Sequence, residues 1–533
     1  MKKFTALLFV MLLSITFIFA NGNSESKAQD AEIEEITFPL KEKVEIKIAT
    51  PDGNTASLSA NLPVWQEIER RTNVKIVWDA IAPNQYNEVM KLRISAGVNA
   101  LPDIMMVPNG LSVAELGEQG IIVDLKDELE VNGKDILAVY DEFPNVKAVA
   151  NADGKIYTIN TIRDKDLAPY GLIIRQDWLD RLGLETPETL DDWVNVLRAF
   201  RDQDANGNGD PNDEVPFSAG GHAWYTTFWG YLWDLNLFQS DGWHALEDGT
   251  MRYDFTTDEA YEFYQWLNGI YAEGLLDPEF MTLGGENALY AKVSQDKVGA
   301  FTAYPGRIPM MEDALRAMGV EDAYLKPVPM PEGPNGRHLE VVNRVNANGY
   351  AVTGASKNRS VAVALMNYIY GTKEGQELMN FGIEGVTYVK NADGTYAYTE
   401  KVTNDPSGRA PKTVLHEFGC RLGAPYVSMD ESVDTEIYTY PERLRNDVIA
   451  LNEATDEYAK QQLVLPPATE EESARISGIS GNISSYIWEM TGKFTVAPFT
   501  RADWDGYVKA LNNMGLQDLL EVKQAQYSRL IAE

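Results

Sequence analysis

The chain has 533 residues, 44% of them apolar and 10% aromatic, a composition typical of a globular protein with a large buried core. Its 80 acidic residues outnumber its 46 basic residues, and the formal net charge of −34 argues against nucleic acid or an anionic membrane surface as a partner. The length predicts at least two domains.

The first forty residues are expected to lie outside the folded domains. Lys2 and Lys3 precede a long apolar run that ends in the small residue Ala20, so residues 1–20 are predicted to be a cleaved signal peptide. Residues 21–40 are polar and acidic, and we expect them to form a flexible leader. The protein is therefore predicted to be periplasmic or extracellular.

The single cysteine limits the possible covalent links. Cys420 is the only cysteine, so the chain cannot form an internal disulfide, and no cysteine stands at the cleavage site to carry a lipid anchor. Because a lone cysteine most often behaves as a small apolar residue, we expect Cys420 to be buried.

The N-terminal part alternates between strand and helix patterns. Apolar residues at every second position predict strands at 44–48 and 74–78, and 101–107 is predicted to be a buried strand. Helices are expected between them, one starting near Asn61 and one over 86–96. This order is typical of a parallel sheet covered by helices.

Further along the chain, two helix starts are well marked. A strand pattern begins at Tyr170, and Thr189 with Asp192 three residues later predicts a capped helix that runs to Phe200. The last hundred residues are mostly helical in pattern, with a second capping box at Thr469 and Glu472.

The segment DQDANGNGDPNDE, residues 202–214, has the spacing of a calcium-binding loop. Calcium prefers six to eight hard oxygen ligands, which alternating carboxylates and amides on a turning backbone supply. The candidate ligands are Asp202, Asp204, Asn206, Asn208, Asp210, Asp213 and Glu214. The alternative is a solvated turn, because Asp, Asn and Gly are common turn formers.

Two registers of this loop are possible. One starts at Asp202 and has Gly207 at the sixth position, and the other starts at Asp204 and closes with Asp213 or Glu214. The sequence after the loop, from Val215, does not continue as an amphipathic helix. We therefore expect a structural calcium site rather than a paired EF-hand sensor.

Four segments together resemble one known family. They are LPDIMMV at 101–107, IRQDWLDRLGLETPETLDDW at 174–193, KEGQELMNFGIEGVTYV at 373–389, and DWDGYVKALNNMGLQDLLEV at 503–522. The chain resembles extracellular solute-binding proteins of family 1, the maltose-binding-protein-like receptors of ABC importers, and within them the lipoprotein-type, alginate-binding-like branch. It departs from that branch in lacking the lipidation cysteine and in the extra Pro211 and Asn212 of the loop.

The resemblance implies an α/β fold of the type II periplasmic-binding-protein class, with two discontinuous lobes joined by a hinge and extra C-terminal helices. The expected lobes are 41–172 with 306–371 for the N-terminal lobe, and 173–305 with 372–533 for the C-terminal lobe. The chain is expected to cross the hinge near 170–175, 301–306 and 370–372.

The resemblance also implies a function. It predicts a monomeric, non-catalytic receptor that captures an oligosaccharide or sugar between its lobes and delivers it to a membrane ABC permease. The alternatives are a calcium-dependent carbohydrate sensing or adhesion protein of the same fold, a binder of peptides or polyamines, and a secreted glycosidase. The glycosidase is disfavoured because the sequence lacks the strong catalytic motifs and its four histidines are not spaced as ligands.

Sugar sites pair aromatic rings, which pack on the sugar faces, with short polar groups that bind the hydroxyls. The segment HAWYTTFWGYLW offers Trp224, Tyr225 and Trp229, although each of these rings could instead belong to the core. Glu384 lies between glycines in a turn that resembles a cleft-facing turn of the family. The remaining candidates, in loops or at a predicted crossing, are Tyr304, Asp52, Asn54 and Asn109.

Overall fold

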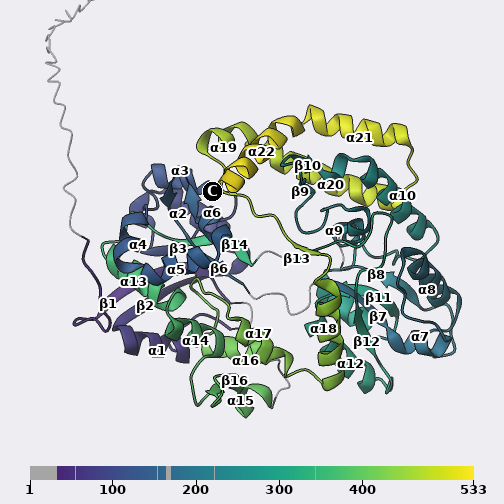
Figure 1. Cartoon of the computed structure of the whole chain (residues 1–533), viewed down its shortest axis with the longest axis horizontal. Coiled ribbons are helices and arrows are strands. Elements are labelled where there is room, and N and C mark those ends of the chain that lie inside the picture. The colour runs from purple at the N-terminus through teal and green to yellow at the C-terminus, as the bar shows by residue number, and fades with distance from the viewer. Residues whose placement is uncertain are drawn as a thin grey trace, which may run out of the picture.

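The computed structural model describes residues 33–53, 56–152, 154–163, 170–220, 223–341, 344–406, 409 and 411–532. Two α/β lobes lie side by side, each built around its own sheet, and the C-terminal helices run along one end of the molecule, over the second lobe and toward the first (Figure 1). The predicted α/β class is confirmed. The predicted signal peptide lies outside the described residues.

The first sheet has five strands in the order β2-β1-β3-β14-β6. The strands β1, β2 and β3 are mutually parallel, and β14 runs antiparallel to both β3 and β6. The bounds are β1 Val44–Pro51, β2 Val74–Ile81, β3 Ile104–Met106, β6 Ile159–Ile162 and β14 Val345–Val352. The three strands expected in this part of the chain are therefore confirmed.

Helices cover both faces of this sheet, because alternate strand residues are apolar on each side. Ile46 and Ile48 of β1 belong to one core cluster, while Ala49 belongs to the cluster on the other face. The helices of this lobe are α1 Pro63–Thr72, α2 Pro83–Ser95, α3 Val113–Glu118, α4 Lys126–Asn132, α5 Lys134–Glu142, α6 Pro144–Ala150, α13 Arg359–Tyr370, α14 Lys373–Phe381, α15 Glu400–Thr403 and α16 Pro411–Phe418. The small strand pairs are β4 Asn151–Ala152 with β5 Lys155–Ile156, and β15 Tyr388–Lys390 with β16 Tyr396–Tyr398.

The second sheet has four strands in the order β12-β7-β11-β8. Strand β11 is parallel to β8 and antiparallel to β7, and β12 is antiparallel to β7. The bounds are β7 Gly171–Arg175, β8 Val215–Ser218, β11 Val298–Ala303 and β12 Leu325–Val328.

The second lobe is richer in aromatic side chains, which fill its main core. Its helices are α7 Gln176–Leu182, α8 Leu190–Asp202, α9 Ala223–Thr226, α10 Asp258–Ala272, α11 Glu286–Val293, α12 Ile308–Ala317 and α18 Glu442–Thr455, with the 3-10 turns η2 Thr227–Trp233, η3 Asp254–Thr256 and η4 Pro305–Arg307. Its strand pairs are β9 Trp243–Ala245 with β10 Met251–Tyr253, and β13 Leu339–Val341 with β17 Ala459–Gln461. Helix α17, Asp430–Ile437, lies where the chain passes between the lobes.

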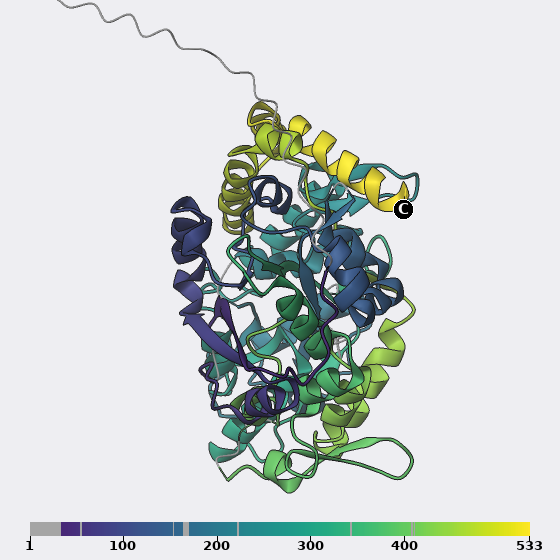
Figure 2. The ribbon, with the colours of Figure 1, turned by 90° about the vertical axis from the view of Figure 1, so that its left-hand side faces the viewer.

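The C-terminal helices are α19 Glu470–Ile476, α20 Ile479–Val496, α21 Arg501–Asn513 and α22 Leu516–Ala532. Their apolar residues, such as Ile483, Phe494 and Trp504, join the aromatic core of the second lobe. The predicted capping boxes at Thr189 and Thr469 are both present. Figures 1 and 2 place these helices at one end of the molecule, with α14 to α16 toward the other end.

The strand pairings and cores differ from the expected lobe boundaries in two places. Strand β12 pairs with β7, so the chain is still in the second sheet at residue 328 and does not cross at 301–306. Helix α14 packs on α13 and shares its core with residues as far as Val427, so the chain does not leave the first lobe at 370–372. The two expected crossings are wrong because strand pairing and helix packing, which join residues far apart in the sequence, decide where each lobe ends.

The hinge is formed by three segments that lie side by side. The Arg163 N–H donates to the Arg344 carbonyl at 2.7 Å, the Ile162 N–H donates to the Tyr426 carbonyl at 2.9 Å, and the Ser428 N–H donates to the Ile162 carbonyl at 2.8 Å. The chain thus passes between the lobes after β6, before β14 and before α17. The first passage agrees with the crossing expected near 170–175, since β7 begins at Gly171.

Part of the expected flexible leader packs on the first lobe. The Ile36 N–H donates to Asn132 Oδ1 at 2.8 Å, and the ring of Phe38 lies edge-on to Tyr368, with centroids 6.2 Å apart. Leu40 joins the same apolar core. The leader prediction is therefore wrong for residues 36–40, because their alternating apolar side chains find a surface to cover. Among the described residues, no helix has both the length and the apolar character that a membrane crossing requires.

Candidate functional site

The loop after α8 folds as a series of tight turns. Gly207 and Gly209 have φ angles of 74° and 93°, a region that glycine adopts without strain. The Asn206 Oδ1 accepts the Asn208 N–H at 2.9 Å, and the Asn208 Oδ1 accepts the Asp210 N–H at 2.7 Å. Asp204 Oδ2 accepts the Gly209 N–H at 3.0 Å and so closes the turn.

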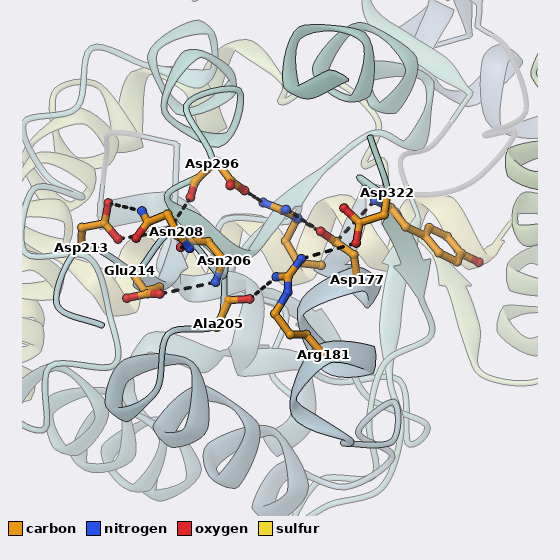
Figure 3. A network of polar contacts seen from close by, with 11 residues as sticks. Asp177, Arg181, Ala205, Asn206, Asn208, Asp213, Glu214, Asp296 and Asp322 are labelled. Carbon is orange, nitrogen blue, oxygen red and sulfur yellow. Dashed lines mark hydrogen bonds and ion pairs between the residues drawn. The ribbon is translucent and has the colours of Figure 1, made fainter. Parts of the chain in front are cut away.

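The acidic side chains of this loop converge around two asparagines (Figure 3). Asp213 Oδ1 accepts from Asn206 Nδ2 at 3.0 Å, and Asp213 Oδ2 accepts from Asn208 Nδ2 at 3.1 Å. Asp204 Oδ1 and Glu214 Oε2 are buried without a hydrogen-bond partner, and burial raises the pKa of Glu214 above its ordinary value. Unpartnered buried carboxylate oxygens are what a cation would satisfy.

The loop geometry favours the register that starts at Asp204. Asp202 is exposed, closes α8 and forms an ion pair with Arg201, whose Nε lies 2.6 Å from its Oδ1. Asp210 is also exposed, and its side chain accepts the Asn212 N–H at 3.2 Å. Within the described ranges, no three His, Cys, Asp or Glu side chains are gathered closely enough to hold a metal by themselves. A cation here would need the amide oxygens of the asparagines as well.

A buried ionic network holds the loop against the second sheet (Figure 3). Arg175, at the end of β7, is fully buried and pairs with both Asp177 and Asp296. The Asp296 carbonyl in turn accepts from Asn206 Nδ2 at 3.2 Å, and Arg181 donates to the Ala205 carbonyl. No sequence pattern predicts this network, because nothing in an apolar strand pattern marks a buried arginine.

Three tyrosines gather at one edge of the second sheet. Tyr225 follows β8 and Tyr304 follows β11, and the two strands are parallel, so both residues leave the sheet at the same edge. Tyr170 precedes the antiparallel β7, which brings it to that edge too. The Tyr170 ring centroid lies 5.2 Å from that of Tyr304 and 6.2 Å from that of Tyr225. Tyr304 is 37% exposed, while Tyr170 is buried beneath it.

Two charged residues near these rings were not predicted. Burial, and after it the carboxylate of Glu286 at the start of α11, raises the pKa of both Tyr225 and the adjacent Tyr290. Arg307, in the turn after Tyr304, acts on Tyr290 in the opposite sense. Glu286 and Arg307 each follow glycine in the sequence. Glycine occurs before charged residues at many positions, so this pattern alone does not predict a binding residue.

The aromatic residues of segment 222–233 differ in their place: some lie at the tyrosine edge of the second sheet and others in the core. Trp229 is 1% exposed, and its ring contacts Trp193 and Phe217 with centroids 5.3 Å away in each case. The prediction that Trp229 could bind ligand is therefore wrong, because η2 turns this side chain into the core. The Trp224 side chain lies outside the described part of the structure, and Tyr225 remains at the edge.

The two candidates that follow strands of the first sheet lie at its carboxyl edge. Asp52 follows β1, and its Oδ1 accepts the N–H groups of Gly53 at 2.9 Å and Leu58 at 2.7 Å, so it shapes the loop. Asn109 follows β3 and is exposed, and its N–H donates to Asn87 Oδ1 at 3.0 Å. Asn54 lies outside the described residues. The hinge segment after β6 leaves from this same edge.

Glu384 lies at the other end of the first sheet. Burial and the nearby carboxylates of Glu377 and Glu384 raise the pKa of Tyr388, and Arg71 opposes them. Arg71 lies in the last turn of α1, three residues before β2 starts at Val74, so this group marks the amino end of the parallel strands. The structure does not bring Glu384 together with the tyrosine edge, because α14 carries its turn away from the carboxyl ends.

Comparison with known proteins agrees with this architecture. The family model described as bacterial extracellular solute-binding protein matches residues 53–376, and the chain belongs to that family. It is 26% identical to the fructooligosaccharide ABC transporter substrate-binding protein FusA of Streptococcus pneumoniae serotype 4, over 99% of this chain and 98% of the relative.

Solved structures show the same two-lobed fold. The alginate-binding protein AlgQ2, crystallised without calcium ion, superposes with a TM-score of 0.75 at 23% identity, covering 93% of this chain and all of that one. An EF-hand mutant of FusA in complex with fructo-nystose has a TM-score of 0.72 at 23% identity, covering 92% and 99% of the two chains. The expected type II fold is confirmed.

Proposed function

We propose that this protein is the receptor of an ABC importer and that it captures an oligosaccharide between its two lobes. The observation that carries the proposal is the similarity over nearly the whole chain to a fructooligosaccharide-binding receptor, combined with an exposed tyrosine at the sheet edge next to the hinge. Family membership supports binding rather than catalysis, and we propose that the bound sugar leaves unchanged.

The ligand site proposed here lies between the carboxyl edges of the two sheets. The second lobe contributes the ring of Tyr304, backed by Tyr170, with Tyr225 beside it. A partly exposed ring supported by a second ring offers a rigid apolar platform for a sugar face. The exposed Asn109 of the first lobe would bind hydroxyl groups. We propose Glu286 and Arg307 as further polar partners, in place of Glu384.

Ligand binding would favour a closed arrangement of the two lobes, which the permease can distinguish from the open one. A ligand that contacts both lobes only when they approach each other stabilises the closed form by the free energy of those added contacts. The three hinge segments are short and joined by backbone hydrogen bonds, which suits a rotation that leaves each lobe intact. The membrane permease would then recognise the closed shape of a monomeric receptor that is exported through its signal peptide.

We also propose that the loop after α8 binds a structural calcium ion. Asp204, Asn206, Asn208, Asp213 and Glu214 would hold it. The two unpartnered carboxylate oxygens fit a hard cation, which supplies charge neutralisation and no chemistry on the sugar. Since Asn206 also bonds the Asp296 carbonyl, an ordered loop would stabilise the second lobe.

Isothermal titration with neutral fructooligosaccharides and with acidic uronic-acid oligosaccharides tests the proposed function. We expect saturable binding to one of the two sugar classes, and mass spectrometry should recover the sugar intact. Tyr304→Ala should weaken binding, while Glu384→Ala, an exposed carboxylate at the other end of the first sheet, should not. Binding of peptides or polyamines but of no sugar would contradict the assignment, and so would sugar hydrolysis.

A further inference from the structure

A second candidate site lies beneath the C-terminal helices, away from the tyrosine edge. A cavity of about 140 Å³ opens between the β9–β10 hairpin and α20. Four aromatic residues line it: Trp243, Tyr253, Phe255 and Trp488. They come from β9, β10, η3 and α20, so the walls of the cavity are brought together by the fold rather than by one segment.

The four aromatic rings of the cavity contact one another in sequence. The centroids of Trp243 and Tyr253 are 4.4 Å apart, those of Tyr253 and Phe255 are 5.7 Å apart, and those of Phe255 and Trp488 are 5.7 Å apart with planes at 86°. The planes of the first two pairs are tilted by 39° and 52°, and rings inclined in this way can each present a π face or an edge to one enclosed group. The remaining apolar lining comes from Ile483, Ile487 and Leu519.

One carboxylate stands at the mouth of the cavity. Asp241 lines the cavity, is exposed, and makes no hydrogen bond or ion pair through its side chain in the described part of the chain. It has a φ of 48°, and the next residue, Gly242, has a φ of 84°. A Cβ on Gly242 would come within 2.4 Å of Phe255 Cδ2, so glycine is what allows the Asp241 turn to approach the rings.

The ammonium group of Lys523 already lies near the Trp243 ring of the cavity. The ammonium of Lys523, on α22, lies 5.8 Å from the centroid of the Trp243 ring, although Lys523 does not line the cavity. The face of an indole ring attracts cations because its π electrons are negative. Lys523 opposes a second cation by charge repulsion, and Asp241 is the lining residue that offsets it.

We infer that this cavity binds a small quaternary ammonium group. Aromatic walls and one carboxylate are the combination that recognises such cations, whose methyl groups also suit the apolar floor. The size agrees, because a cavity of about 150 Å³ can hold a molecule as large as benzene. An oligosaccharide does not fit this volume, and the hydroxyl-bearing residues of the lining are Tyr253, Ser480 and Ser484. The site is independent of the proposed sugar site.

Isothermal titration of the purified protein with choline tests the inference. The control ligand is 3,3-dimethylbutan-1-ol, which has the shape of choline without its charge. We expect choline to bind saturably and the neutral alcohol to bind at least about tenfold more weakly. Asp241→Asn keeps the turn, because asparagine tolerates a positive φ, and should weaken choline binding about five- to tenfold.

Two further variants keep the test falsifiable. Glu489→Gln removes the same charge from the exposed face of α20, outside the cavity lining, and should leave choline affinity within about twofold of wild type. Trp488→Leu keeps the charge of Asp241 but removes one aromatic ring of the cavity. It should weaken choline binding without changing the affinity for sugar. Equal binding of choline and the alcohol, equal losses in Asp241→Asn and Glu489→Gln, or no choline binding at all would overturn the inference.

Discussion

Glu340 is a buried carboxyl group whose ionisation should destabilise the second lobe. It lies on β13, is 4% exposed, and its Oε1 accepts the hydroxyl of Ser240, while Oε2 is buried without a partner. Burial raises the pKa of Glu340 from its ordinary 4.5 to about 7, with Ser240 and His244 opposing the rise. Nearby Asp254 raises it further, although this carboxylate is itself paired with His244 and Arg252.

The sign of the effect follows from the raised pKa. Glu340 contributes full stability when it is protonated, below pH 4.5, and the contribution is lost as pH rises through about 7. One pKa unit corresponds to about 1.4 kcal/mol, so the ionised group costs the folded state about 3 kcal/mol at pH 8. Glu340→Gln should therefore match wild type near pH 4.5 and exceed it by about 3 kcal/mol at pH 8.

Urea unfolding of both proteins at pH values from 4.5 to 8 measures this difference. Comparing the two at the same pH cancels the opposite trend of His338, whose pKa burial lowers to about 4 and whose contribution is lost as pH falls from 6.5. Glu489→Gln, on an exposed face, is the matched control and should show no pH-dependent gain. A gain for Glu340→Gln that stays constant or shrinks between pH 4.5 and 8 would refute the reasoning.

Three further predictions concern the loop and the ligand edge. EDTA should lower the melting temperature of wild type but not of Asp204→Ala, which lacks a proposed calcium ligand; an unchanged wild-type melting curve in metal-free buffer would contradict the calcium proposal. Tyr304→Ala should weaken sugar binding about tenfold with little change in melting temperature, and equal affinity in titration would remove Tyr304 from the site. Trp229→Ala should instead cost about 3–5 kcal/mol of stability in urea unfolding, because a fully buried ring is lost; a cost below about 1 kcal/mol would contradict the core assignment.

The local elements could be predicted because their signals are local. Strand alternation marked β1 and β2, and hydroxyl-to-carboxylate spacing marked the caps at Thr189 and Thr469. Cys420 is buried, as a lone cysteine is expected to be. The lobe boundaries were not predictable in this way, because pairing of β12 with β7 joins residues about 150 positions apart.

The ligand edge was only partly predictable. The sequence indicates Tyr225 as part of an aromatic segment and Tyr304 as an aromatic residue at an expected hinge crossing, and the parallel pairing of β8 with β11 does bring them together. Trp229 belongs to the same aromatic segment, but its side chain is buried in the core. It lies within η2, where neighbouring positions point in different directions, so the aromatic residue type alone does not predict burial. The Arg175 network could not be anticipated, because its partners Asp177 and Asp296 are brought together only by the fold.

The central claim is tested most directly by titrating the protein, in calcium buffer, with a panel of neutral and acidic oligosaccharides. Tryptophan fluorescence reports binding at each step of the titration. The account predicts a saturable change with one sugar class, lost or weakened in Tyr304→Ala, and intact sugar recovered afterwards. No response to any sugar, or recovery of shortened sugar, would contradict an oligosaccharide receptor.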